Sequence, residues 1–289
     1  MRSSPARLVA HRVVRRVFEE DAFADRAFRG EASELDSRDR ALAMRLAYGT
    51  IQRKGTLAWI TGRLAKGRLE PGVRAALWLG LYQLLYADGI PDHAAIAESV
   101  ELAKPSHGHK VVNAVLRRVQ RDGVELPGDD TPEGAAVHHS HPEWVVKLWW
   151  DWIGPESTRA LLAADNEPAE HALRVNTLVA EDFPGRRDPE LPEARILDGP
   201  LDVFATPEWA TGGIMAQSRS SMHVARAVDP QPGERVLDLC AAPGGKTTHL
   251  AALMGDRGEV VAVERHAGRA TSLRETCARM RARSKRPAR

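Results

Sequence analysis

The sequence predicts an α plus α/β protein: an all-helical bundle, a small mixed region, and the incomplete start of a doubly wound parallel sheet. Apolar residues recur at helical spacing through residues 1–135, without sustained period-two alternation. Short strand-like segments broken by Pro and Gly follow. The last segment has a strand–turn–helix–strand–helix rhythm, which is typical of a parallel α/β sheet. We expect domain boundaries at 1–138, 139–225 and 226–289.

In the helical part, the spacing of apolar residues and the residues that mark helix ends predict the same helices. Val9, Val13 and Val17 recur on one helical stripe, Leu35-Asp36-Ser37 supplies caps before the next helix, and Pro71 sits where a first helical turn tolerates proline. Residues 121–142 are rich in Gly, Pro and Asp, which predicts a linker. Two short helices are expected after it, over 143–153 and 155–166.

The second half predicts strands first and then a βαβα unit. The segments 171–178 and 195–205 have the composition of short strands. After them we expect a strand over 235–239, a turn over 240–245 and a helix to about residue 254. A second strand over 259–263 and a helix from about residue 267 complete the pattern. Two parallel strands alone leave the faces and edges of a sheet incomplete.

Composition narrows the class of protein. The 289 residues carry 41 basic and 39 acidic side chains, a net charge of +2 that neither favours nor excludes nucleic acid. Only two cysteines occur, Cys240 and Cys277, which excludes a disulfide scaffold and a Cys-rich zinc site. The basic N-terminus lacks an uninterrupted apolar core, and no window is long enough to span a bilayer. We expect a soluble, cytoplasmic protein.

The stretch RVLDLCAAPGGKTTHLAA, residues 235–252, carries the strongest chemical signal. Its tail Gly245-Lys246-Thr247 matches the end of a phosphate-binding P-loop, but Cys240 stands where that pattern needs its first glycine. The glycine spacing of a nicotinamide-dinucleotide site is absent. An ordinary strand-to-helix turn does not require this run of small residues. An adenosine-type cofactor without phosphates therefore fits best.

Several residues would serve such a cofactor. Small residues such as Gly245 let a ligand approach the backbone closely, and Pro243 stiffens the turn. Asp238, at the end of the first strand, could accept hydrogen bonds from an amino group. Glu264, after the second strand and twenty positions beyond Gly244, is placed to bind ribose hydroxyls.

These residues carry a family resemblance. LDLCAAPGGKTTHLA with VVAVE is similar to the S-adenosylmethionine motifs of the RNA 5-methylcytosine methyltransferases, and LRVNTL and residues 212–239 resemble their lead-in. Residues 40–60, 93–104 and 112–119 resemble the NusB-like RNA-binding domain. Together they resemble the RsmB (Sun) subfamily, which methylates a cytosine of small-subunit ribosomal RNA.

The resemblance implies a NusB-like bundle before a Rossmann-like, S-adenosyl-L-methionine-dependent methyltransferase fold. Its partner would be small-subunit ribosomal RNA, with no membrane and no metal, and we expect a monomer. Cofactor contacts would come from the loop and from the end of the second strand, at Cys240, Ala241, Ala242, Pro243, Gly244, Gly245, Lys246 and Glu264.

The chain departs from the family at the catalytic step. The family uses a cysteine in a Pro-Cys dipeptide to attack C6 of cytosine, and a second cysteine for release. This sequence contains no Pro-Cys. Cys240 and Cys277 are interpreted as small, buried or half-buried structural residues. We assign no catalytic residue and expect these 289 residues to be inactive.

The basic tail allows two interpretations. Residues 269–289 contain eight Lys or Arg against one acid, Glu275. The favoured interpretation is a frayed, disordered end of a truncated or frame-shifted gene. The alternative is a basic arm that binds RNA phosphates.

Three other features leave alternatives open. His138, His139 and His141 favour a solvated loop over a metal site. Four tryptophans favour interdomain packing over base stacking: Trp144, Trp149, Trp150 and Trp152. A set of basic residues is either an RNA face or generic surface: Arg12, Arg15, Arg16, Arg38, Arg40, Arg53, Lys54, Arg117 and Arg118. The alternative function is a non-enzymatic NusB-like RNA-binding module in transcription antitermination.

Overall fold

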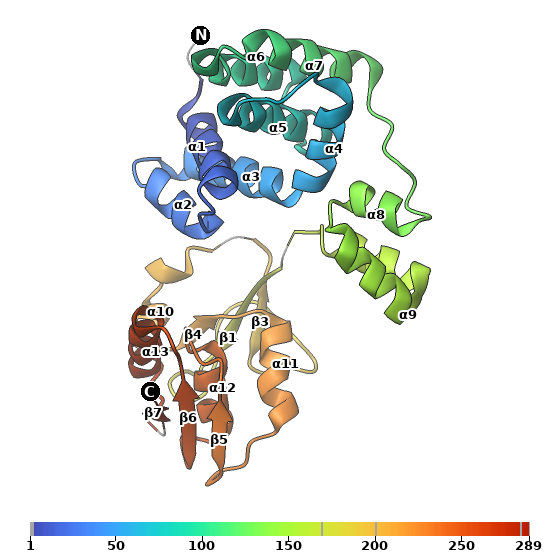
Figure 1. Ribbon diagram of the computed structural model, residues 1–289. Helices are drawn as coiled ribbons and strands as arrows, with labels where there is room; N and C mark the ends of the chain where they lie inside the picture. The colour runs from blue at the N-terminus through green and yellow to red at the C-terminus, as the bar shows by residue number, and fades with distance from the viewer. Residues whose placement is uncertain (1–2, 169, 200, 284, 289) are drawn as a thin grey trace. The chain divides into compact units, whose positions relative to one another are not determined.

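The computed structural model describes residues 3–168, 170–199, 201–283 and 285–288. The chain divides into two compact units, residues 1–167 and 168–289 (Figure 1). Unit 1 is entirely helical in its described residues, and unit 2 contains two sheets with helices. This arrangement confirms the predicted α plus α/β fold class.

Unit 1 is built around one central helix. Helix α5 (Pro71–Tyr86) contacts α1, α3, α4, α6 and α7, and its Leu77, Leu79 and Leu81 are fully buried. Such burial on all sides of a helix places it inside a bundle. The other helices of the unit are α1 (Pro5–Glu19), α2 (Ala24–Glu31), α3 (Ser37–Gln52), α4 (Lys54–Leu64), α6 (Asp92–Leu102), α7 (His109–Asp122), α8 (Pro132–His139) and α9 (Glu143–Ala164), with a 3-10 turn η1 (Lys104–Ser106).

Helix boundaries follow the expected signals. Asp36 caps α3 by accepting a hydrogen bond from the backbone N–H of Asp39 at 2.8 Å. Pro71 is the first residue of α5. Helix α9 is broken at Gly154, where φ is 79° and ψ is 166°, so two helical segments meet where the sequence predicts two helices.

The predicted linker over 121–142 contains a helix. Thr131 caps α8 by accepting from the N–H of Gly134 at 3.1 Å, and Pro132 opens its first turn. His138 and His139 lie in its last turn, and His139 contacts Asp129. The prediction of a loop is therefore wrong for His138 and His139, whereas His141 lies outside the helix. No cluster of candidate metal ligands occurs in the described part of the chain.

The tryptophans of α9 fall into two kinds. Trp149 and Trp150 pack on an apolar cluster formed by α8 and α9. Trp144 and Trp152 are 69% and 73% exposed. Among the described helices, none is both long and apolar enough to cross a membrane.

Unit 2 begins with a four-stranded antiparallel sheet of order β2–β3–β1–β4. Leu173 on β1 pairs with Arg195 on β3, and Arg174 pairs with Met215 on β4. The elements are β1 (His171–Val175), β2 (Arg186–Arg187), β3 (Ala194–Leu197), η2 (Val203–Ala205), α10 (Pro207–Thr211), β4 (Ile214–Ala216) and α11 (Arg219–Val228).

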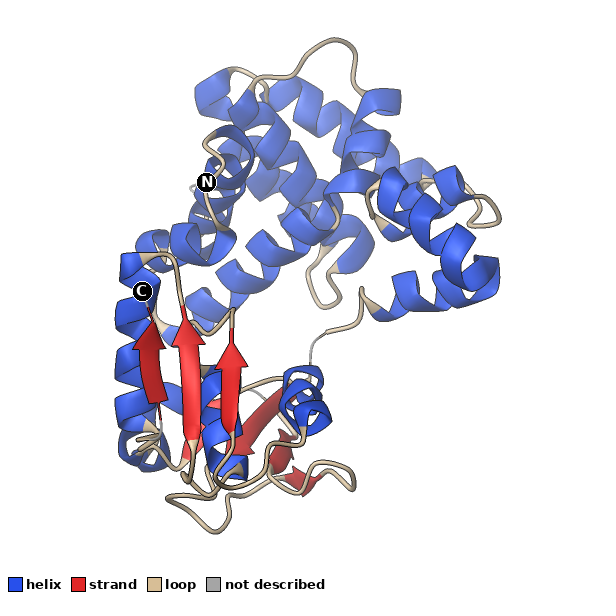
Figure 2. Cartoon of the chain, turned by 60° about the horizontal axis from the view of Figure 1, so that its bottom comes forward, coloured by secondary structure: helices blue, strands red, loops and turns tan. Residues whose placement is uncertain are grey.

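The second sheet is parallel, with order β5–β6–β7 (Figure 2). Its elements are β5 (Arg235–Asp238), α12 (Gly245–Leu253), β6 (Glu259–Val263), α13 (Ala267–Arg279) and β7 (Lys285–Ala288). Because the strands are parallel and in register, Asp238 and Ala262 are neighbours. The segments that follow β5 and β6 therefore leave from the same edge of the sheet.

Strand β7 corrects two expectations. The sequence predicts only two parallel strands and a frayed end, but Lys285–Ala288 pairs with β6. The free edge of β6 offers backbone N–H and C=O groups that pair whatever the side chains are. Pro287 lacks an N–H and suits an edge strand.

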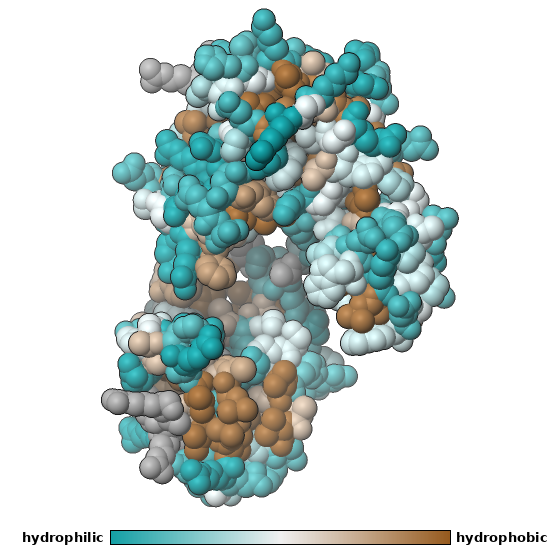
Figure 3. Space-filling view, in the orientation of Figure 1, coloured by the Kyte–Doolittle hydropathy of each residue, from teal (hydrophilic) through white to brown (hydrophobic). Residues whose placement is uncertain are grey.

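The two faces of the parallel sheet differ. On one face, Val260 and Ala262 are buried against helices, in clusters that include Met254 and Leu273. On the other face, Leu237 is 57% exposed. Apolar side chains gather over β5 and β6 in Figure 3. One face is thus covered, and the other presents an apolar surface.

Candidate cofactor site

The loop between β5 and α12 is braced by Asp238. One carboxylate oxygen accepts from the backbone N–H of Cys240 at 3.1 Å, and the other accepts from the hydroxyl of Thr247 at 2.7 Å. Asp238 thus joins the first and last parts of the loop. Each oxygen keeps a further lone pair, so an additional bond from an amino group stays a prediction.

The small side chains of the loop pack against the rest of unit 2. Ala241 and Ala242 are buried and pack in a cluster with Leu273 and Cys277 of α13. The N–H of Ala241 donates to the carbonyl of Val263 at 3.3 Å, which fastens the loop to the end of β6. The side chains of both alanines therefore face the protein core.

Gly244 is explained by the approach of α13. Its φ is 110°, in the left-handed region that favours glycine. A Cβ there would also lie 3.0 Å from the side chain of Thr276 on α13. Gly245 has more room, because its nearest neighbour would be Gln217 at 3.8 Å. Close ligand approach thus remains a prediction for Gly245, whereas helix packing already requires Gly244.

The outward side of the loop carries the remaining predicted residues. Cys240 and Pro243 are exposed, and Gly245 and Lys246 are half-buried. The expectation that Cys240 is a buried or half-buried residue is wrong, because its side chain lies outside the loop. Cys277 is fully buried on α13, as the sequence predicts.

Glu264 follows β6 directly and lies at the same sheet edge as the loop. Its carboxylate accepts from the backbone N–H of His266 at 2.8 Å, and this bond holds its pKa below the usual range. Arg269 lies 3.3 Å from the Glu264 carboxylate and donates to the carbonyl of Ala242 at 2.9 Å. One guanidinium therefore links the loop to Glu264. Sequence reasoning missed Arg269, although it stands in the first turn of the helix after Glu264.

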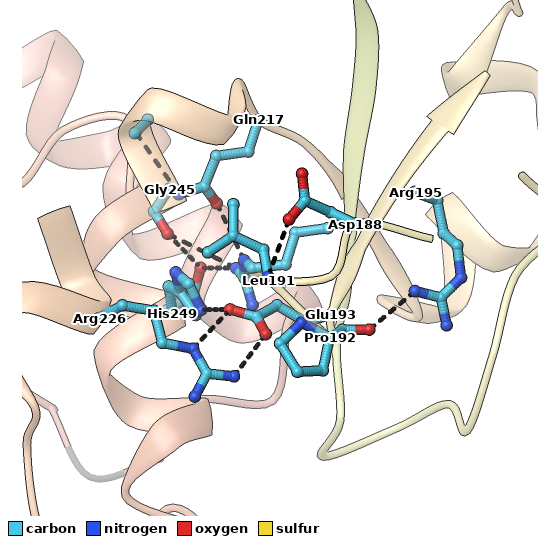
Figure 4. A network of polar contacts seen from close by, with 12 residues as sticks. Asp188, Leu191, Pro192, Glu193, Arg195, Gln217, Arg226, Gly245 and His249 are labelled. Carbon is cyan, nitrogen blue, oxygen red and sulfur yellow. Dashed lines mark hydrogen bonds and ion pairs between the residues drawn. The ribbon is translucent and has the colours of Figure 1, made fainter. Parts of the chain in front are cut away.

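A network of polar contacts joins Glu193 to helices α11 and α12 (Figure 4). Glu193 accepts from His249 of α12 at 2.7 Å and from Nε of Arg226 of α11 at 3.0 Å. Burial raises the pKa of Glu193, but these two donors outweigh burial and hold it well below the usual range. Burial lowers the pKa of the His249 ring, against the opposing bond to Glu193. The carboxylate is thus ionised beside a ring whose neutral form is favoured.

Arg174 extends this network to the loop. Its Nε donates to Gln217 at 2.9 Å, and its Nη2 donates to the hydroxyl of Thr248 at 2.8 Å. Sequence reasoning missed the network because its members are spread from residue 174 to residue 249. Charged and polar residues are mostly exposed in proteins, and residues so far apart in the sequence show no local sign that they meet.

Two family models match separate parts of the chain. The NusB family matches residues 4–121, and the 16S rRNA methyltransferase RsmB/F family matches residues 225–286. A relative from Synechocystis sp., a probable ribosomal RNA small subunit methyltransferase B, is 34% identical over 300 residues, covering 95% of this chain and 67% of the relative. The chain belongs to the RsmB family.

Other RsmB relatives agree. The probable methyltransferase B of Bacillus subtilis is 36% identical over 270 residues, covering 86% of this chain and 60% of its own length. The methyltransferase B of Pseudomonas putida is 33% identical, covering 95% and 66%. The chain thus spans 60–67% of the length of these relatives. Matches over both units favour the methyltransferase over the alternative of a NusB-like module alone.

A solved structure shares the fold. The crystal structure of PH0851 covers 100% of this chain and 70% of its own, with a TM-score of 0.74 and 21% identity. At this identity the likeness concerns the fold. The match extends over both the helical unit and the α/β unit of this RsmB family member.

Proposed function

We propose that this chain is the RNA-docking and cofactor-binding portion of an S-adenosylmethionine-dependent methyltransferase. Its substrate would be C5 of a cytosine in small-subunit ribosomal RNA, and the protein would act in the cytoplasm as a monomer without a metal. The observation that carries the proposal is the meeting of the loop 240–246 with Glu264 at the carboxyl edge of a parallel sheet. Ligands bind at this edge in open α/β sheets.

The residues present fit the cofactor. Glu264 is an ionised acceptor with lone pairs suited to ribose hydroxyls. The first N–H groups of α12, at Gly245 and Lys246, lie at the helix end that favours negative charge, which suits a cofactor carboxylate. Bound S-adenosylmethionine supplies a methyl group on a sulfonium. Cys240, Ala241, Ala242, Pro243 and Gly244 would form the rest of the cradle.

The RNA side of the proposal rests on unit 1. Several predicted basic residues are engaged within the protein: Arg16 pairs with Glu20 and Glu31, and Arg53 stacks on Tyr86. Two others form no ion pair among the described residues: Arg38, which is exposed, and Arg117, which donates to Gln120 at 3.0 Å. Both guanidinium groups are candidates for contacts with phosphates. We therefore assign RNA docking to the NusB-like part rather than to the loop.

Neither cysteine suits the attack on cytosine. Cys277 is fully buried on α13. Cys240 is exposed, but it belongs to the loop assigned to the cofactor. The family's reaction needs a thiolate that reaches C6 of the base. The 289 residues are therefore expected to bind cofactor and RNA without transferring the methyl group.

Titration with S-adenosylhomocysteine, the demethylated product, tests the cofactor site. A ligand at 100 times its Kd stabilises a protein by about 2.7 kcal/mol, so thermal melting reports binding. We expect saturable binding by the wild-type chain and a loss of about tenfold or more in affinity for Glu264→Ala. The matched control is Glu275→Ala, on the exposed side of α13, which should bind as wild type does. Absence of binding, or equal affinity in both variants, overturns the assignment.

The transfer step has a separate test. The chain is incubated with methyl-labelled S-adenosylmethionine and ribosomal RNA that lacks the modification. We expect retention of RNA on the protein but no label in the RNA. Appreciable methyl incorporation would contradict the absence of a catalytic residue.

A further inference from the structure

Arg174 is a buried cation that makes no hydrogen bond or ion pair with a carboxylate among the described residues, although the charge of Glu193 acts on it. It lies on β1 and is fully buried. The partners described for it are Gln217, Thr248 and, at 3.5 Å, the carbonyl of Gly245, all neutral groups. Nη1 has no partner among the described residues. Burial lowers its pKa to about 10. A charge in such a place is costly, so a purely structural core would be better served by an apolar residue.

The contacts of Arg174 converge on one point of the chain. Thr248, which accepts from its Nη2, in turn donates to the carbonyl of Gly244 at 2.8 Å and lies 3.2 Å from that of Gly245. The guanidinium is thus joined to the two carbonyls where the loop becomes α12. Gly244 is also the residue whose backbone conformation is left-handed, so this junction sets the direction of the loop.

We propose that Arg174 is a positioning residue that fixes the junction Gly244–Gly245 and thereby the cofactor loop. The planar fork of arginine donates to Gln217 and Thr248 at once, which holds α12 against the antiparallel sheet. The inference rests on the proposed function only in taking the loop 240–246 as the cofactor's cradle. The mechanical part, that Arg174 orders the loop, concerns the ligand-free protein.

A neighbouring arginine offers a matched control. Arg195 on β3 is 2% exposed and pairs next to Arg174 across the antiparallel sheet, opposite Leu173. Its hydrogen bonds go to Asp182, Phe183, Pro192 and Ala194, none of which belongs to α12 or to the loop 240–246. Both arginines are buried in one sheet, but only Arg174 contacts the junction.

Hydrogen exchange of the ligand-free protein tests the mechanical part. Arg174→Met and Thr248→Val should each raise amide exchange over residues 239–248 by about tenfold or more. Arg195→Met should lower the melting temperature without a selective change in that segment. Arg174→Lys serves as a second variant in case Arg174→Met does not fold. Lysine keeps the charge but lacks the planar fork of arginine, so this variant should fold and still show faster amide exchange in the loop. Loop exchange that is unchanged in Arg174→Met, or raised equally in Arg195→Met, overturns the proposal.

A double-mutant cycle on affinity tests the functional part. Arg174→Met and Thr248→Val should each weaken binding of S-adenosylhomocysteine by about tenfold, and the double variant should lose little more, because both act through one contact. Full additivity, or wild-type affinity in Arg174→Met, contradicts the proposal. If the wild-type chain does not bind the cofactor, the proposed function fails, whereas the exchange result still decides the role of Arg174.

Discussion

Helix α5 of unit 1 and helix α12 of unit 2 are packed into their units by different kinds of interaction. Helix α5 buries Leu77, Leu79 and Leu81, and its surroundings form one continuous apolar core. Helix α12 buries Thr247, Thr248 and His249, each hydrogen-bonded to a residue outside the helix, and its apolar neighbours form separate small clusters. Apolar burial is non-directional, whereas hydrogen bonds fix distance and angle.

This difference matches what each helix carries. Helix α5 is the middle of a bundle, where total buried area decides stability. Helix α12 carries a loop whose usefulness depends on its direction. We infer that the polar residues of unit 2 orient the loop, and that the leucines of unit 1 stabilise a scaffold.

Removal of the carboxylate of Glu193 should have the largest effect. Glu193→Ala leaves His249 and Arg226 without their shared hydrogen-bond acceptor and removes the charge that opposes the buried Arg174. This should cost about 3–5 kcal/mol in unit 2. Urea unfolding followed by hydrogen exchange measures each unit separately. Glu190→Ala, at a carboxylate whose side chain is 77% exposed, is the control and should change stability by under about 0.5 kcal/mol. Equal stability of the two variants would show that the polar contacts of Glu193 do not stabilise unit 2.

Truncation of a side chain in the apolar core around α5 should destabilise unit 1. Leu77→Ala removes a fully buried side chain and should cost about 2–5 kcal/mol. Exchange should accelerate in residues 3–167, while affinity for S-adenosylhomocysteine stays at the wild-type value. Weakened cofactor binding in the folded variant would show that the apolar core also orients the loop.

Acidification should weaken unit 2 in two stages. The pKa of His249 is lowered by burial, so below the unfolded value of about 6.5 the unfolded chain takes up a proton that the folded chain does not. Stability should fall with pH there, by at most about 1.4 kcal/mol per pH unit for one proton. Glu193, whose pKa is lowered, adds a second loss below about 4.3.

A variant isolates the first stage. His249→Gln keeps an amide donor for Glu193 but does not titrate, so its stability should be flatter between pH 5 and 6.5. Denaturant midpoints for unit 2 over this range measure the slope. An unchanged slope would assign the pH dependence to other groups.

The smallest effect is expected at a helix cap of unit 1. Asp36→Ala removes the acceptor for the N–H of Asp39 and should cost about 1 kcal/mol. Thermal melting with Asp36→Ser, which keeps a capping oxygen, as the control measures it. Equal losses in both variants would show that the carboxylate charge rather than the cap stabilises α3.

The sequence predicts elements well where local signals suffice. The cap at Asp36, the break at Gly154 and the bounds of β6 all follow from residues next to one another. Helix α8 is not predicted because its segment is rich in glycine and proline, although Thr131 and Pro132 are typical of the start of a helix. Strand β7 has no apolar alternation, and only the free edge of β6 accounts for it.

The candidate site divides in the same way. The loop and Glu264 are recognisable because they lie within one short βαβ segment. Arg174, Glu193 and Arg226 are brought together only by the packing of two sheets and their helices. No local pattern marks Arg174 and Glu193 as buried. Their importance follows from contacts across the fold, which a single sequence does not display.

The most direct test of the central claim is an NMR titration of the ¹⁵N-labelled chain with S-adenosylhomocysteine. We expect saturable shifts of the backbone amides of residues 240–242, 244–246 and 264–266. Arg174→Met should weaken these shifts, and Arg195→Met should leave them unchanged. Absence of shifts, or shifts confined to residues 3–167, would contradict the claim.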